Sequence, residues 1–306
     1  MSVFGRDQNE AWTPPIARAE GFVLCNAFEA ILKGIFECEW PVADVFAPRR
    51  PPLDMLFRIL VEPRAFEVAE RHGLVLHTCV DATRAVELAL RAAAQGKRAV
   101  AFVPNDQLHA AMNVLAREGG GQTSGEGRVV VVLEDNPYLS STACPLQSAS
   151  QLDLPCLAPS TVAGLRIGIQ DAFRVAQACE RVVALIAHVG LLRSMDTLEI
   201  EPNRVLDRVD AALELRRNRR PLRSAEREEP LVIARRLELN QLSAMPSPGE
   251  MEPWGMIAMG SCVMAIRHLL EELGLSGRVP LLALSMPHPL DSASLVRLLS
   301  RCANVV

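Results

Sequence analysis

The sequence predicts an α/β protein with a doubly wound, mostly parallel sheet, followed by a smaller α/β unit. Helix and strand signals alternate from Phe22 onward, and such alternation places parallel strands in a sheet that is covered on both faces. The run Arg-Val-Val-Val-Val-Leu at residues 128–133 is typical of a strand buried on both faces. Of the 306 residues 49% are hydrophobic and 22% are charged. This composition supports a large core and argues against a disordered chain.

In the first 200 residues, the spacing of apolar residues sets the expected elements. Apolar residues that recur every three or four positions predict helices at residues 26–39, 53–61, 66–72, 82–94, 108–117 and 161–179. Short apolar runs bounded by turn residues predict strands at residues 74–80, 99–104, 128–133 and 181–188. Gly96 follows the alanine-rich helix as a natural C-cap.

The end of the chain predicts a second unit. Strands are expected at residues 255–259 and 279–284, with helices at 262–273 and 292–301, and a further strand signal begins at residue 304. Because that strand is not completed, we expect this unit to be truncated or to continue on another subunit. The expected organisation is a lead-in at residues 1–20, a first domain at 21–200, a charged linker at 201–250 and an incomplete second domain at 251–306.

The charge balance argues against several classes of partner. Lys and Arg number 32 and Asp and Glu number 36, so the chain is a poor general binder of nucleic acid or of an anionic membrane. The arginine run at 216–220 precedes several glutamates, which favours a solvated, self-paired helix. The sequence has neither the roughly 18 consecutive apolar residues of a membrane span nor a signal-peptide core at its start.

The eight cysteines are scattered and have no metal-ligand spacing. We therefore expect no metal on this chain, reduced thiols and a cytoplasmic location.

Polar residues that follow the predicted strands are the candidate functional residues, because ligands of such sheets bind beyond the carboxyl ends of the strands. Asp81 and Asp135 each follow a strand, and Ser140 and Ser141 come later in the loop after Asp135. Asp81 also suits the N-cap of the helix that begins at Ala82, and Asp135 also suits a turn. The sequence leaves both roles open for each aspartate.

Other candidates are weaker. The glycine-rich stretch 119–127 precedes a strand, whereas a phosphate loop follows a strand and opens a helix. His288 lies between two prolines, which favours a packed loop residue over a catalyst. Asn105, Asp106 and Glu134 also follow predicted strands.

Short segments in order along residues 21–200 and 250–306 resemble a known enzyme family. They are Glu29-Ala30-Ile31 with Gly34 and Glu37, the loop Pro48–Asp54, Val80-Asp81 with Glu87 and Gly96-Lys97-Arg98-Ala99, Asp135 with Ser140-Ser141, and Gly255, Gly260 and Pro287-His288-Pro289-Leu290. This series resembles the thiamine diphosphate-dependent 2-oxoacid:ferredoxin oxidoreductases. Within that family it is most similar to the indolepyruvate ferredoxin oxidoreductase alpha subunit, which has a pyrimidine-binding domain and a transketolase C-terminal-like domain.

The resemblance implies a shared cofactor site and several partners. This chain would supply the pyrimidine half of a site for thiamine diphosphate with magnesium, and a partner would supply the pyrophosphate half. Iron–sulfur clusters would lie on partner chains, with ferredoxin reached indirectly, and a homo- or hetero-oligomer is implied. The implied cofactor-binding positions are Asp81, Ala82, Asp135, Ser140 and Ser141, and the implied binders of a substrate carboxylate are Arg49 and Arg50.

The sequence departs from the family where the cofactor would lie. The activating glutamate of the family falls on Ala82, whose methyl group cannot hold a proton, and Asp81 remains the nearest catalytic candidate. Three functions follow as alternatives. The chain is a divergent subunit of an active oxidoreductase of the indolepyruvate or pyruvate type; or it is an inactive relative kept as a structural or interaction subunit; or it is an unrelated small-molecule-binding module of doubly wound fold.

Overall fold

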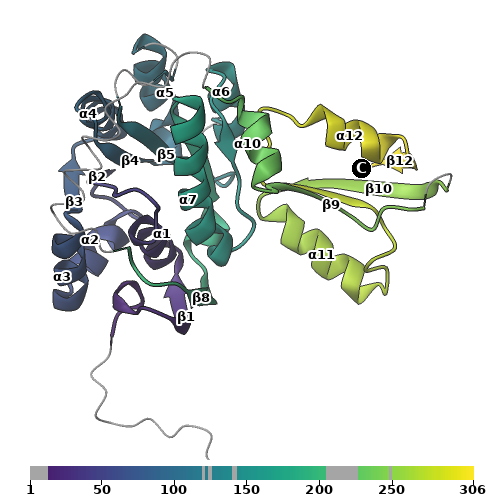
Figure 1. The fold of residues 1–306 in the computed structure, drawn as a ribbon, viewed down its shortest axis with the longest axis horizontal. Helices are drawn as coiled ribbons and strands as arrows, with labels where there is room; N and C mark the ends of the chain where they lie inside the picture. The colour runs from purple at the N-terminus through teal and green to yellow at the C-terminus, as the bar shows by residue number, and fades with distance from the viewer. Residues whose placement is uncertain (1–12, 119–120, 123–125, 140–142, 205–226, 248–249) are drawn as a thin grey trace, which may run out of the picture.

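The computed structural model shows a six-stranded parallel sheet with helices on both faces and a smaller four-stranded sheet beside it (Figure 1). The structure describes residues 13–118, 121–122, 126–139, 143–204, 227–247 and 250–306. The predicted α/β, doubly wound class is confirmed. No helix in these described ranges is both long and apolar enough to cross a membrane.

The six strands lie in the order β3-β2-β4-β5-β7-β6, and every neighbouring pair is parallel. Their bounds are β2 Asp44–Pro48, β3 Val75–Cys79, β4 Arg98–Val103, β5 Arg128–Asp135, β6 Cys156–Leu157 and β7 Val183–His188. The central strands β2, β4 and β5 are buried along almost their whole length. Burial on both faces explains why the sequence of β5 is continuously apolar rather than alternating.

Two layers of helices cover this sheet. One face packs against α1 Ala27–Phe36, α2 Asp54–Val61, α3 Pro63–His72 and α7 Val162–Cys179. The other face packs against α4 Ala82–Ala94, α5 Leu108–Arg117 and α6 Pro145–Gln151. The described part of this unit also contains three short helical turns: η1 Pro15–Ala17, η2 Asn105–Gln107 and α8 Val189–Leu192. The bounds of α4 and α5 agree with those predicted from the sequence.

The winding of the sheet reverses between β2 and β4. The chain leaves β2 towards α2 and α3 on one face, and it leaves β4 towards α5 on the opposite face. The two loops therefore diverge from one point at the carboxyl edge of the sheet. In doubly wound folds this topological switch point is where ligands bind.

A two-stranded antiparallel ribbon lies outside the main sheet. It joins β1 Gly21–Asn26 to β8 Met195–Ile200. Behind it, Glu37 is buried between Lys33 and Arg166 and also accepts a hydrogen bond from the Glu201 backbone N–H at 2.9 Å. These charged groups fasten α1 to α7 and to the segment that follows the ribbon.

The smaller sheet has the order β12-β10-β11-β9. Its elements are β9 Asn240–Ser243, β10 Glu252–Met259, α11 Cys262–Glu272, β11 Leu281–Leu284, α12 Ser292–Leu299 and β12 Cys302–Val305. The strand predicted to begin near residue 304 is thus present as β12. The range predicted as a linker contributes β9 to this sheet and also α10 Pro230–Arg236, which packs against α7.

The two units meet along β6. The backbone N–H of Cys156 donates to the carbonyl of His288 at 2.7 Å, and Ala158 donates to Ser285 at 2.8 Å. The imidazole of His288 lies 3.2 Å from a carboxylate oxygen of Asp153. His288 is thus a packed loop residue at this junction, as its position between two prolines predicted.

Candidate functional site

The switch point at the carboxyl edge is spanned by an ion pair. Arg50 follows β2 and Asp106 follows β4, and Nη1 of Arg50 lies 2.8 Å from Oδ2 of Asp106. About 40% of each side chain is exposed. A solvated pair of this kind contributes about 0–1 kcal/mol, so a ligand with a stronger charge could separate it at little cost.

Asp81 acts as a helix cap at this edge. Its Oδ1 accepts a hydrogen bond from the backbone N–H of Arg84 at 2.8 Å, which satisfies one of the free donors in the first turn of α4. Of the two roles that the sequence left open for Asp81, the structure shows the cap. Its Oδ1 is therefore engaged in capping α4.

The structure does not place the Ala82 side chain in a cleft. Ala82 is the first residue of α4, has no exposed surface and belongs to the core cluster on this face of the sheet. Its backbone N–H donates to Oε1 of Gln107 at 2.7 Å. A glutamate at position 82 could act on a cofactor only if the side chain faced a cleft. The burial of Ala82 in the core therefore gives no support to the idea that its replacement of a glutamate removes activity.

Asp135 presents a free carboxyl group at the same edge. It is the last residue of β5 and is half-buried, and its side chain forms no hydrogen bond or ion pair with the described residues. Burial raises the pKa of Asp135, and the nearby His188 partly offsets that rise. A half-buried carboxyl group whose pKa is raised by burial is a candidate functional residue.

A buried polar network holds the loops around Asp135. The carboxylate of Glu134 accepts hydrogen bonds from the Asn105 backbone N–H at 3.3 Å and from the Asn136 amide at 3.1 Å. The Asn105 amide in turn donates to the carbonyls of Glu134 and Ala143, at 3.2 and 3.3 Å. These bonds fix the chain that leaves β4 relative to the chain that leaves β5.

Arg49 and Arg50 are not brought together. Arg50 pairs with Asp106, whereas the guanidinium of Arg49 lies 5.8 Å from the ring of Phe57 and lines a separate groove. The arrangement therefore does not form the two-arginine carboxylate clamp expected from the resemblance. Ser140 and Ser141, and the arginine run 216–220, lie outside the described residues.

Asp106 and Glu134 were weaker candidates in the sequence because they follow strands, and the structure places both at this edge. Gln107 is the residue that the sequence did not single out. It carried no signal, because its hydrogen bond to the start of α4 depends on how η2 packs against that helix.

Comparison with known proteins shows the fold. No protein-family model and no curated protein matches the sequence. A solved structure of 2-oxoglutarate:ferredoxin oxidoreductase from Magnetococcus marinus, with 2-oxoglutarate, coenzyme A and succinyl-CoA bound, aligns with a TM-score of 0.63 and 14% identity. The alignment covers 93% of this chain and 57% of that one, so the chain spans little more than half of the oxidoreductase chain.

A second solved structure, a split gene transketolase in an inactive beta4 tetramer, aligns with a TM-score of 0.52 and 13% identity, over 91% of this chain and 77% of that chain. The fold is thus one found in both a 2-oxoacid:ferredoxin oxidoreductase and a transketolase. A particular likeness to indolepyruvate enzymes is not supported by these structures and stays a prediction.

Proposed function

We propose that this chain is a subunit of a thiamine diphosphate-dependent enzyme of the 2-oxoacid:ferredoxin oxidoreductase type. In this proposal its carboxyl edge supplies the pyrimidine half of the cofactor site. The observation that carries the proposal is Asp135, a half-buried carboxyl group at the carboxyl edge of the sheet that has no partner among the described residues. The fold shared with the oxidoreductase over 93% of the chain supports it.

The residues at this edge fit the pyrimidine half. A carboxyl group with a raised pKa can share a proton with a ring nitrogen, and Asp135 is free to do so, whereas Asp81 is engaged as a cap. When bound, thiamine diphosphate supplies the carbanion chemistry. The contribution of Asp135 is to hold a proton beside the pyrimidine and to orient that ring.

The rest of the machinery belongs to partners in this proposal. Magnesium and the pyrophosphate would be held by a partner chain, and the iron–sulfur clusters by another, with electrons passed on to ferredoxin. The substrate class proposed from the resemblance is a 2-oxo acid of the indolepyruvate or pyruvate type. Arg50 could bind its carboxylate by exchanging Asp106 for the substrate, since both groups are partly exposed.

An inactive structural subunit is the second candidate, and one observation favours it. Several polar groups at the carboxyl edge already satisfy one another: Arg50 with Asp106, Asp81 with the Arg84 backbone, and Gln107 with the Ala82 backbone. A chain kept only for packing would show such internal pairing.

Calorimetric titration of thiamine diphosphate with Mg²⁺ tests both candidates. The titrations use the chain alone and the chain co-purified with its partner, with Asp135→Asn and the matched control Asp81→Asn. Asparagine caps helices as well as aspartate does, so Asp81→Asn should bind like the wild type. Asp135→Asn should weaken binding by about tenfold, the value of one charge-assisted hydrogen bond. Absence of heat in every titration would leave the inactive subunit, and equal weakening by both variants would contradict the assignment to Asp135.

The pH dependence of stability gives an independent test of Asp135. Burial raises the pKa of Asp135 in the folded protein above its value in the unfolded chain. Between these two pKa values the folded protein binds more protons than the unfolded chain, so stability falls as the pH rises through that window. Asp135→Asn removes that cost. The melting temperature of the variant should therefore exceed that of the wild type at pH 7, and the gain should vanish as the pH approaches about 4. A constant gain at every pH would show that charge is not its cause.

A further inference from the structure

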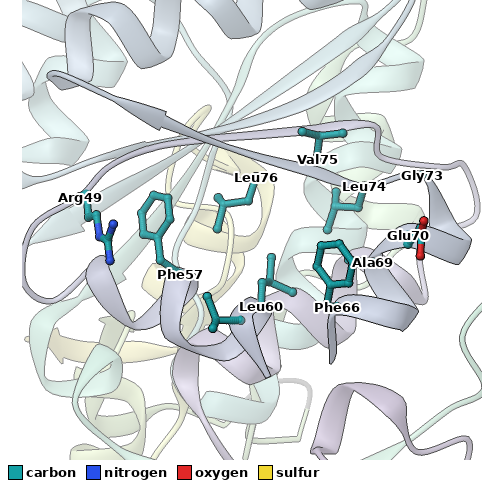
Figure 2. A pocket seen from close by; sticks show the side chains of 11 residues that line it. Arg49, Phe57, Leu60, Phe66, Ala69, Glu70, Gly73, Leu74, Val75 and Leu76 are labelled. Carbon is teal, nitrogen blue, oxygen red and sulfur yellow. The ribbon is translucent and has the colours of Figure 1, made fainter. Parts of the chain in front are cut away.

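A groove of about 710 Å³ lies between α2, α3 and the edge strand β3 (Figure 2). Its volume lies within the range of sites that hold small organic ligands. Apolar side chains from all three elements form its walls, among them Phe57, Leu60, Phe66, Leu74 and Leu76. This groove takes no part in the function proposed above, and Asp135 does not line it.

Large apolar side chains along the groove are exposed to solvent. Val61 is 78% exposed and Phe66 is 57% exposed, and both line it. Single exposed apolar residues are ordinary, but a concave cluster of them marks a binding surface. The surface is therefore suited to an apolar ligand.

The two ends of the groove carry opposite charges. Arg49 lies at one end and Glu70 at the other (Figure 2). The Arg49 guanidinium lies 5.8 Å from the centre of the Phe57 ring and forms no ion pair with any residue of the described ranges. It thus offers a planar set of N–H donors, beside an apolar wall, to an anion from outside the chain.

We propose that this groove binds a small monocarboxylate with an unbranched apolar tail. The carboxylate pairs with the fork of Arg49, and the tail runs past Phe57, Leu60 and Leu76 towards Phe66. A single guanidinium matches the geometry and charge of one carboxylate. Glu70 at the far end repels a second anionic group, so a dicarboxylate of the same length is rejected.

Four probes test this proposal on the full chain by calorimetry, and three of them share a chain of eight carbons. Octanoate is the expected ligand. Hexanoate lacks two methylenes and should bind about fifteenfold more weakly, because each buried methylene contributes roughly fourfold in affinity. Suberate carries a second carboxylate at the far end of a chain of the same length, and octan-1-ol lacks the charge. Both should bind at least about tenfold more weakly than octanoate.

Hydrogen exchange then locates the site. Octanoate should slow exchange in residues 57–76, which cover the second half of α2, all of α3 and the start of β3. It should leave the small sheet unchanged. Protection elsewhere without protection in residues 57–76 would overturn the proposal.

Two pairs of variants test separately the contact with the carboxylate head group and the contact with the apolar tail of octanoate. Arg49→Gln should abolish the preference for octanoate over octan-1-ol but retain the dependence on chain length, whereas the exposed Arg58→Gln should change neither. Phe66→Ser should weaken octanoate by about tenfold. Leu269→Ser, a change at 51% exposure on α11, should not.

Sedimentation of wild type and Phe66→Ser identifies a different occupant. A self-associated wild type that Phe66→Ser dissociates, and that octanoate does not, would assign the groove to a second copy of the chain. That result would refute the carboxylate site, as would affinities that do not depend on the head group.

Discussion

Ala82→Glu separates the two possible environments of residue 82. In the structure the Ala82 methyl has no exposed surface and packs within the core cluster formed with α4. A carboxyl group placed there without a partner costs about 3–5 kcal/mol, and the added volume costs about 1–3 kcal/mol more. At roughly 2–4 °C per kcal/mol, we expect the melting temperature to fall by about 10 °C or more.

The assay is thermal unfolding followed by circular dichroism, with Thr83→Glu as the matched control. Thr83 is the next residue in the first turn of α4 and is partly exposed, so a glutamate there faces solvent and the positive end of the helix. Its melting temperature should be unchanged or slightly higher. If Ala82→Glu is as stable as the wild type, and especially if it also gains affinity for thiamine diphosphate, residue 82 faces a cofactor cleft and the inward placement is refuted.

Two further predictions concern the interior. Glu37→Gln removes the anion between two buried cations, so it should destabilise the fold by about 3–5 kcal/mol in a urea titration; a loss below about 1 kcal/mol would show that the network is solvated. Thiol labelling of the native protein at pH 8 should modify the exposed Cys144 and Cys262 quickly. It should spare Cys156, since burial raises the pKa of that thiol to about 12; rapid labelling of Cys156 would contradict its burial.

Elements with a strong local pattern could be predicted from the sequence. The first and last residues of the helices at 82–94 and 108–117 were predicted correctly, because their apolar spacing and end signals lie within the segments themselves. The ribbon of β1 and β8 was missed because its strands are distant in sequence and only their pairing stabilises them. Strand β9 was missed for the same reason, since it depends on antiparallel pairing with β11.

The candidate site was only partly accessible to sequence reasoning. Position after a strand was sufficient to select Asp81 and Asp135 but not to tell them apart. The difference arises from local contacts. The helix N-terminus engages Asp81, whereas Asp135 is half-buried at the end of β5 and has no partner among the residues that the structure describes.

The sequence by itself determined the fold class, most helices and the candidate edge of the sheet, because apolar periodicity and strand order are properties of the chain. Only the tertiary structure decided where each side chain points. It turned Ala82 into the core, separated Arg49 from Arg50 and left a groove beside β3. Direction depends on which elements pack against a residue, and those neighbours come from distant parts of the chain.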